Sequence, residues 1–491
     1  MRTVSLGAIF RLLRWPFVLL SVTIIPRIMG DFMYGRYAFF SSVYLLADML
    51  TDVSIIQIFG RFVPGDESDE HHEHRRQLLA GVLVFGIVLT VTLATILSLV
   101  VYIHPFDSLP NIWLGPLCIL LFVTRIESVL FSFLYGLNHI ARYSSRDVLR
   151  SMFSFVNVVI FYSLFGLIGA IWAMVLREIV LTIIVIPWVK DYLLPRRFLP
   201  WSDMKKYLVF GFQFYVPILL FGILQRSGNV FIQFITDSPE SVGHFDIASQ
   251  FSLMSLNFLG LILMTLLPSM TKLHVDNEQE TIHRWHGSVL TYCGVIIALV
   301  FNMLVWLGKP SIEICLGSDF APTYSVVLVM VLAMAPGLVC YMGMNYAILE
   351  KKPNAYTSGV TFGIIGMALV CLILIPHIGA IGAGWATLVG YFILAMFFTA
   401  RYRRHLLTTI ANFVKPLLIG ACFVIGLAFD VRLRNAILLF AISSVLYLTV
   451  LSALHIIKWS ELTRIVESVF RQARHNSPSQ QIKTFVSNGQ T

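Results

Sequence analysis

Charged side chains inside long apolar segments are the residues of this sequence whose types and spacing could do chemistry. Asp48 and Asp52 lie four residues apart, so a helix would place both on one face. Such a pair could bind a coupling proton or cation, because burial disfavours two adjacent negative charges. Alternatively, the two carboxylates anchor a neighbouring arginine and have a structural role.

Arg125 and Arg226 are the deep arginines of the two halves of the chain. A charged group inside a membrane normally faces a cavity or pairs with an opposite charge, and a guanidinium can bind phosphate through two hydrogen bonds. Arg125 and Glu127 are only two residues apart, so they point to different sides of a helix and need separate partners. We expect Arg125 to contact a phosphate or an anionic sugar; an ion pair with Asp48 or Asp52 is the alternative.

Arg226 has the polar neighbours Gln225, Asn229 and Gln233 in a segment that is otherwise apolar and contains glycine. We therefore expect its side chain to face a cavity that receives substrate.

Three more residues allow two interpretations each. Arg27 either lines the cavity or extends to the membrane interface. Asn257 either contacts sugar or bridges two helices. Glu178 follows Arg177 and is either a proton site or half of an ion pair within its own bundle.

The composition explains why these charges are scarce. Of 491 residues, 57% are hydrophobic and 12% are charged, whereas soluble domains are about 45–50% apolar and about 25% charged. A spanning helix takes about 20 apolar residues, so fourteen would use about 280, close to the apolar share of this chain. The sequence predicts an all-α polytopic membrane protein. The net charge of +9 fits basic cytoplasmic loops. No nucleic-acid-reading, nucleotide-binding, hydrolase or metal motif is present, so we expect neither an enzyme nor a nucleic-acid or metal binder.

Apolar runs predict fourteen membrane spans. The even-numbered loops and both chain ends carry most of the lysines and arginines, including Arg401, Arg403 and Arg404. The positive-inside rule then places both termini in the cytoplasm of a bacterial or archaeal plasma membrane. The predicted spans are residues 8–29, 37–62, 78–103, 111–137, 148–166, 169–189, 207–235, 244–271, 287–308, 322–349, 357–376, 380–400, 409–429 and 435–457.

An internal repeat organises these spans. The segment GLIGAIWA from Gly166 matches GAIGAGWA from Gly379, an offset of 379 − 166 = 213 residues. Gly35-Arg-Tyr37 resembles Gly243-His-Phe245 at an offset of 243 − 35 = 208 residues. An even number of spans per repeat makes the two copies parallel. We therefore predict two six-helix lobes related by a pseudo-two-fold axis.

The repeat also predicts the division of the chain. The N-lobe takes residues 1–190 and the C-lobe residues 205–400, while residues 409–457 form an extra helical hairpin. Residues 458–491 are predicted to form a cytoplasmic surface helix followed by a disordered tail.

The segments Gly35-Arg-Tyr37, Asp52-Val-Ser54 and Arg61-Phe-Val-Pro64 together resemble a family signature. It is that of the polysaccharide-export flippases in the multidrug/oligosaccharidyl-lipid/polysaccharide exporter superfamily. Members commonly show Gly-x-Tyr, Asp-Leu-Gly and then Arg-Phe-x-Pro; here Ser54 stands in place of the second motif's glycine. The resemblance implies gating or structural roles for Asp52 and Arg61.

The resemblance also implies a function. A V-shaped, two-lobed flippase would move a polyprenyl-pyrophosphate-linked oligosaccharide from the cytoplasmic to the outer leaflet by alternating access, for O-antigen or other surface polysaccharide assembly. The alternatives are a cation-coupled multidrug exporter, which normally has twelve spans, and a peptidoglycan lipid-precursor flippase, which has fourteen. We expect membrane lipids, a polysaccharide polymerase and other assembly proteins as partners of a monomer. No cofactor is expected; protons, Na⁺ or the membrane potential are open as the energy source.

Overall fold

The computed structural model describes residues 2–63, 69–103, 111–195, 199–275, 279–350, 353–421, 433–454 and 456. The elements in these ranges are all helical. The helices are α1 (Arg2–Thr51), α2 (Ile55–Phe62), α3 (Asp69–Ile103), α4 (Leu114–Gly136), α5 (Ile140–Val189), α6 (Trp201–Arg226), α7 (Gly228–Thr236), α8 (Pro239–Val275), α9 (Gln279–Met303), α10 (Lys309–Cys315), α11 (Thr323–Leu349), α12 (Pro353–Arg401), α13 (Arg403–Ala421) and α14 (Leu433–Ala453).

Three of these helices are hairpins of two spans. α1, α5 and α12 contain 50, 50 and 49 residues, and a straight helix of that length would measure about 75 Å, more than twice the hydrocarbon core. Each turns at a glycine with a left-handed φ: Gly30 (73°), Gly166 (62°) and Gly379 (53°). Glycine suits these turns because it has no Cβ to clash there. Gly166 and Gly379 are also the two positions that the 213-residue repeat equates.

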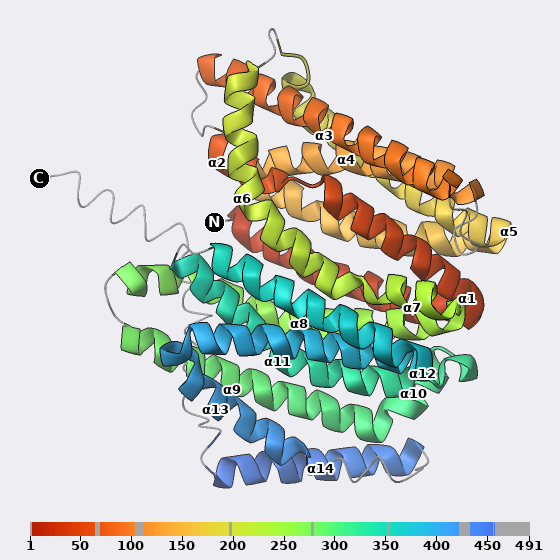
Figure 1. Cartoon of the computed structure of the whole chain (residues 1–491), viewed down its shortest axis with the longest axis vertical. Coiled ribbons are helices and arrows are strands. Elements are labelled where there is room, and N and C mark those ends of the chain that lie inside the picture. The colour runs from red at the N-terminus through yellow and green to blue at the C-terminus, as the bar shows by residue number, and fades with distance from the viewer. Residues whose placement is uncertain are drawn as a thin grey trace, which may run out of the picture.

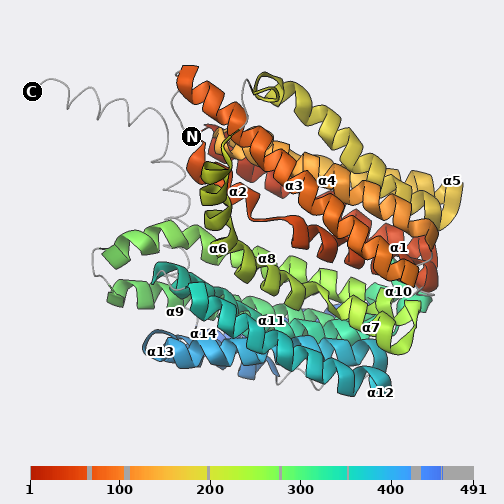
Figure 2. The ribbon, with the colours of Figure 1, turned by 45° about the horizontal axis from the view of Figure 1, so that its top comes forward.

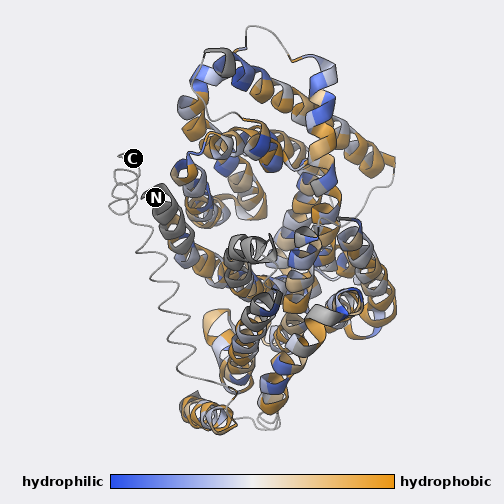
Figure 3. Ribbon diagram, turned by 90° about the vertical axis from the view of Figure 1, so that its left-hand side faces the viewer, coloured by the Kyte–Doolittle hydropathy of each residue, from blue (hydrophilic) through white to orange (hydrophobic). Residues whose placement is uncertain are grey.

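The predicted fold class is confirmed. Eight helices in the described part of the chain are long and apolar enough to cross a membrane, and the three hairpins among them account for two spans each. Every predicted span overlaps a helix. Figure 3 shows hydrophobic residues along most helices, with hydrophilic stretches at the top of the view, where Figure 1 places the starts of α3 and α6.

The helices form two lobes. α1–α5 pack together as the N-lobe in the upper part of Figure 1, and α8–α12 form the body of the C-lobe below. The extra pair lies at the far side of the C-lobe: Asn302 of α9 donates to Ser443 of α14 at 2.9 Å, and Tyr447 of α14 donates to the Pro416 carbonyl of α13 at 3.0 Å. The exact limits of the lobes in sequence stay predictions, and the predicted surface helix and tail lie outside the described residues.

α6 connects the lobes at the end of the bundle where α2 lies, which we call the α2 end. Its first half packs on the N-lobe: the ring of Tyr207 lies 4.5 Å from that of Phe62, and a Cβ on Gly211 would come within 2.8 Å of the Val53 carbonyl. The helix then bends by 41° between Gln213 and Tyr215. α6 therefore reaches across both lobes, as Figure 2 shows.

The lobes meet at the opposite end, which we call the Gly30 end, where α1 lies beside α7 and α8 (Figures 1 and 2). A Cβ on Gly35 would clash with the Pro239 carbonyl, and a Cβ on Gly243 would lie 3.0 Å from the Asp31 carbonyl. The offset of 208 equates 31 with 239 and 35 with 243, so the two contacts are symmetric copies. We call this close approach the glycine crossing.

Candidate substrate site

Arg125 lies on α4 and is fully buried. Its Nη2 donates to Asp48 Oδ1 at 2.8 Å, to the Asp48 carbonyl at 2.9 Å and to the Thr51 hydroxyl. Asp52 Oδ1 lies 3.8 Å from Nη1. Of the two sequence interpretations, the structure shows the ion pair; the guanidinium is enclosed in the N-lobe and offers no surface to a substrate in this conformation.

The buried carboxylates Glu127 and Glu178 of the N-lobe are also paired with arginines. Glu127 takes a bidentate pair of hydrogen bonds from Arg146, at 2.7 and 2.5 Å. Glu178 Oε1 accepts from Arg150 at 2.8 Å and lies 2.6 Å from Arg177 Nη2. Glu178 therefore forms an ion pair within its lobe, as one of its two interpretations stated. Four arginines face four carboxylates, so this N-lobe network has no net charge.

The C-lobe has no copy of this network. Gly363 and Gly390 occupy the repeat positions of Arg150 and Arg177, and a Cβ on either would lie about 3 Å from the other's carbonyl oxygen. The two halves of α12 thus touch backbone to backbone where the N-lobe has two arginines that share Glu178. Across the repeat, the positions of Arg125, Glu127, Arg146, Arg150, Arg177 and Glu178 hold Leu338, Cys340, Gly359, Gly363, Gly390 and Tyr391.

Arg226 is the deep cation of the C-lobe and is half-buried at the end of α6. Among the described residues, no carboxylate lies within ion-pair distance of it. Its charge interacts with Asp246 and Tyr391 at longer range. The amide of Gln225 beside it lies close to the hydroxyl groups of Tyr341 and Tyr391. Unlike Arg125, Arg226 can therefore bind an anion without breaking an existing pair.

A polar cluster joins the lobes close to the glycine crossing. Asp246 of α8 accepts from Tyr34 of α1 at 2.7 Å, from Asn229 of α7 at 2.8 Å and from Gln250 at 2.5 Å. Asn229 also donates to Ser42 of α1 at 2.7 Å. We call these five residues the Asp246 cluster.

Sequence reasoning missed the Asp246 cluster. Asn229 was identified only as a polar neighbour of Arg226. A signal was present, because Asp246 follows Gly243 by three residues and Tyr34 directly precedes Gly35, so each lies beside a glycine of the crossing.

The remaining candidates lie at contacts between elements. Arg27 is exposed and donates to the Ile314 carbonyl of α10 at 2.8 Å, a contact between the lobes. The Asn257 side chain accepts from Tyr341 of α11 at 3.1 Å, so it bridges two helices. Arg61 is exposed with its guanidinium 5.4 Å from the Phe210 ring centre of α6.

The second span is broken beside Asp52. Ser54 has a left-handed φ of 48°, and the Ile55 amide that begins α2 donates to Asp52 Oδ1 at 3.3 Å. A left-handed residue is where glycine is favoured, which gives a physical reason for the glycine in the Asp-Leu-Gly motif. Tyr215 of α6 donates to the Leu50 carbonyl at 2.8 Å. The break, the N-lobe network and α6 are therefore in direct contact.

No group of three or more His, Cys, Asp and Glu side chains that could hold a metal ion occurs among the described residues.

Comparisons with known proteins agree with this architecture. The structure is similar to one entitled "Lipid II flippase MurJ, inward closed conformation", with a TM-score of 0.73, 13% identity and coverage of 92% of this chain and 100% of that one. It is also similar to an inward-facing multidrug resistance MATE family transporter of the MOP superfamily, with a TM-score of 0.67, 14% identity and coverage of 81% and 95%. At these identities the likeness concerns the fold. None of the curated proteins compared matches the sequence.

A family model described as "Polysaccharide biosynthesis protein" matches residues 7–274, more than half of the chain. That range includes all three motifs of the signature and residues 7–190 of the predicted N-lobe. The resemblance found in the sequence is confirmed: the chain belongs to the polysaccharide biosynthesis protein family and has the fold of the multidrug/oligosaccharidyl-lipid/polysaccharide exporter superfamily.

Proposed function

We propose that this protein is an alternating-access flippase that moves a polyprenyl-pyrophosphate-linked oligosaccharide from the cytoplasmic to the outer leaflet for surface polysaccharide assembly. The observation that carries the proposal is that the buried arginines of the N-lobe network are paired with carboxylates and the deep arginine of the C-lobe is not. The four arginines of the N-lobe network pair with carboxylates, whereas Arg226 has no ion pair among the described residues. A pyrophosphate that crosses a membrane needs such a cation, because burial of an unpaired charge is costly.

The surroundings of Arg226 suit a glycan headgroup. Gln225 supplies an amide beside Arg226, and the side chain of Asn257, which accepts a hydrogen bond from Tyr341, is exposed on α8. A few polar groups in an otherwise apolar wall are typical of a site that orients a polar ligand. A drug exporter would not need a free cation here, since its usual substrates are apolar or cationic.

The contacts at the Gly30 end suggest how binding and opening are connected. Asp246 interacts with Arg226 at longer range and also holds Tyr34 of the N-lobe. A pyrophosphate bound to Arg226 would add negative charge near Asp246 and so weaken the hydrogen bonds that hold the lobes together. We propose that substrate binding favours opening at this end by that route.

Orientation and coupling follow from the same proposal. The distribution of basic loops supports an orientation with the Gly30 end outside and both termini in the cytoplasm of a bacterial or archaeal plasma membrane. In our proposal, Asp48 and Asp52 bind Arg125 and thereby stabilise the helix break at Ser54. Their role in gating is then structural. The driving force is then a proton, Na⁺ or the membrane potential acting elsewhere on the transport cycle.

The polysaccharide substrate is preferred to the peptidoglycan precursor because the family model that matches is described by polysaccharide biosynthesis. Both substrates share a polyprenyl pyrophosphate, so Arg226 would serve either. Rescue of a strain without its polysaccharide flippase, compared with rescue of one without its peptidoglycan-precursor flippase, distinguishes them. Growth rescue of the second strain alone would contradict the proposed substrate.

Arg226→Ala tests the site in cells. We expect it to lower surface polysaccharide at least tenfold, because a charge-assisted hydrogen bond contributes about 1.5–3 kcal/mol, while membrane insertion stays normal on immunoblots. Arg226→Lys should retain part of the activity. Arg401→Ala is the matched control, since Arg401 is an exposed arginine at the end of α12. Full surface polysaccharide in the Arg226→Ala strain would contradict the assignment.

A further inference from the structure

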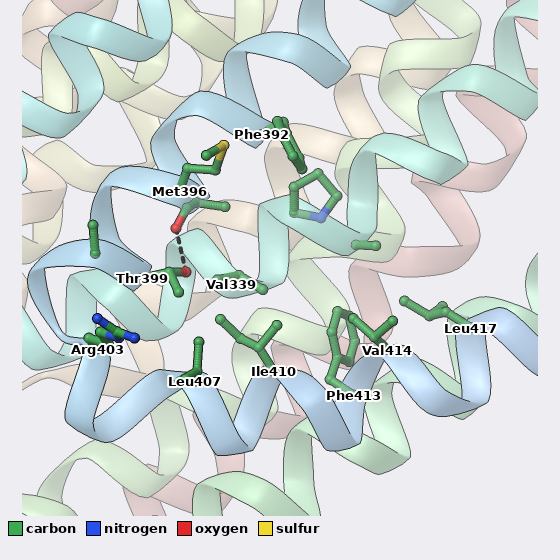
Figure 4. Close-up of a pocket in the computed structure, with 14 residues that line it drawn as sticks. Val339, Phe392, Met396, Thr399, Arg403, Leu407, Ile410, Phe413, Val414 and Leu417 are labelled. Carbon is green, nitrogen blue, oxygen red and sulfur yellow. Dashed lines mark hydrogen bonds between the residues drawn. The ribbon is translucent and has the colours of Figure 1, made fainter.

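The C-lobe has a groove on the side where the extra pair is attached. It has a volume of about 620 Å³ and lies between α11, α12 and α13. α13 packs mainly along α9 and leaves this space between itself and the two other helices. Figure 4 shows the α13 side chains Ile410, Phe413 and Val414 facing Val339 and Phe392 across it. Pockets for small ligands are about 300–1,000 Å³, so the groove is large enough for a lipid chain.

The wall of the groove is apolar and opens on the membrane-facing surface. Phe392, Met396 and Leu407 line it and are half or more exposed, whereas Val339 and Phe413 form its buried floor. The one hydroxyl drawn in Figure 4, that of Thr399, donates to the carbonyl of Ala395 at 2.7 Å and so offers no free donor. The wall is therefore suited to bind a hydrocarbon chain.

A single charged residue, Arg403, lies at one end of the lining. It is exposed, and no ion pair or hydrogen bond of its side chain is found within the described residues. Arg403 begins α13 two residues after Arg401, in a loop that the distribution of basic residues predicts on the cytoplasmic side. The groove thus runs from a cation at the level of the lipid phosphates into the hydrocarbon region.

We propose that this groove binds an anionic phospholipid of the cytoplasmic leaflet, with one acyl chain along α13 and the phosphate on Arg403. Basic residues at the inner mouth of grooves between membrane helices bind anionic headgroups in this way. No residue of α1–α8 lines the groove, so a substrate held at Arg226 between the lobes would not fill it. The occupant is therefore a lipid other than the substrate, held where the extra pair joins the C-lobe.

Native mass spectrometry of the full chain tests this proposal. The protein is released from nanodiscs of phosphatidylcholine containing a minor fraction of phosphatidylglycerol, and the bound lipids are counted. We expect a retained phosphatidylglycerol in the wild type. Arg403→Ala should reduce the preference for phosphatidylglycerol about fivefold, which corresponds to one basic residue near a membrane surface. Val414→Trp should fill the groove, so that neither phosphatidylglycerol nor phosphatidylcholine is retained. Protein yield should be unchanged, because Val414 is partly exposed.

Two controls make the result specific. Arg401→Ala removes a neighbouring arginine that does not line the groove, and Ile442→Trp adds the same bulk to an exposed face of α14. Both should bind phosphatidylglycerol as the wild type does. Equal retention by the wild type, Arg403→Ala and Val414→Trp would overturn the proposal. Displacement of the bound lipid by added polyprenyl phosphate would also overturn it, since the groove would then belong to the substrate's own tail.

Discussion

Arginine has two different environments in this protein, and in our proposal one environment serves the structure and the other serves transport. Arg125 is enclosed and makes hydrogen bonds to Asp48 and Thr51, whereas Arg226 is half-buried and makes no ion pair within the described residues. A buried charge whose partner is removed costs several kcal/mol, because the remaining charge is left unpaired. Arg125 is therefore committed to the N-lobe, while Arg226 gains by binding an anion.

The pair formed by Arg125 and Asp48 should contribute to stability. We expect Arg125→Ala to lower the free energy of unfolding by roughly 3 kcal/mol, because it leaves Asp48 facing Asp52 without a counter-charge. Thermal unfolding of the purified protein in detergent measures this, with Arg401→Ala as the exposed control. A variant that unfolds like the wild type but fails to transport would instead give Arg125 the substrate role that the sequence suggested.

At this scale the sequence supplied the right residues but not their partners. The spacing of Asp48 and Asp52 placed both on one face, and the spacing of Arg125 and Glu127 correctly excluded them as a pair. The partner of each lies on another helix, as with Glu127 and Arg146. One sequence does not report the rotation of one helix against another, so both alternatives stayed open until the structure was known.

Helices of this protein turn and approach each other at glycines. Gly166 and Gly379 take the same left-handed conformation, and Gly35 and Gly243 let α1 and α8 meet backbone to backbone. The repeat predicted both equivalences, because the same local geometry requires the same residue in each copy. The length of the hairpin helices was not predicted, since the sequence pattern shows apolar runs and not how tightly they are joined.

Gly35→Ala should separate the lobes at the Gly30 end. The added Cβ clashes with the Pro239 backbone, which cannot rotate away as a side chain does. We expect a longer and broader distance between spin labels on the exposed residues Met33 and Asp319, in a Cys315→Ser background, by double electron–electron resonance. Gly115→Ala is the control, because a Cβ there meets nothing within 4 Å. An unchanged distance in Gly35→Ala would mean that the crossing does not hold the lobes together.

As a whole, the molecule is closed at the Gly30 end and is covered by α6 at the α2 end. The Asp246 cluster and the glycine crossing both lie at the Gly30 end. Tyr207 packs on Phe62 at the α2 end. Composition and loop charge predicted a two-lobed membrane protein. They did not predict which conformational state the protein adopts, because the contacts between lobes join residues far apart in the sequence, such as Tyr34 and Asp246.

Asp246→Asn should loosen the closed state. Tyr34, Asn229 and Gln250 all donate to this carboxylate, and an amide replaces one acceptor by a donor. A hydrogen bond to a charged group contributes about 1.5–3 kcal/mol, so opening should become at least about tenfold more frequent. The measurement is the rate of thiol labelling of Ala38→Cys, a buried position between Gly35 and Ser42, in a Cys315→Ser background. Labelling at the wild-type rate would show that the Asp246 cluster does not control opening.

The central claim, that Arg226 carries the pyrophosphate of a lipid-linked glycan across the membrane, is tested most directly in proteoliposomes. The measurement is the rate at which a fluorescent polyprenyl-pyrophosphate-linked oligosaccharide passes between leaflets, for the wild type, Arg226→Ala, Arg226→Lys and Arg401→Ala. We predict transport by the wild type and Arg401→Ala, partial transport by Arg226→Lys, and a loss of at least tenfold in Arg226→Ala. Transport by Arg226→Ala at the wild-type rate, or none by the wild type, would contradict the account.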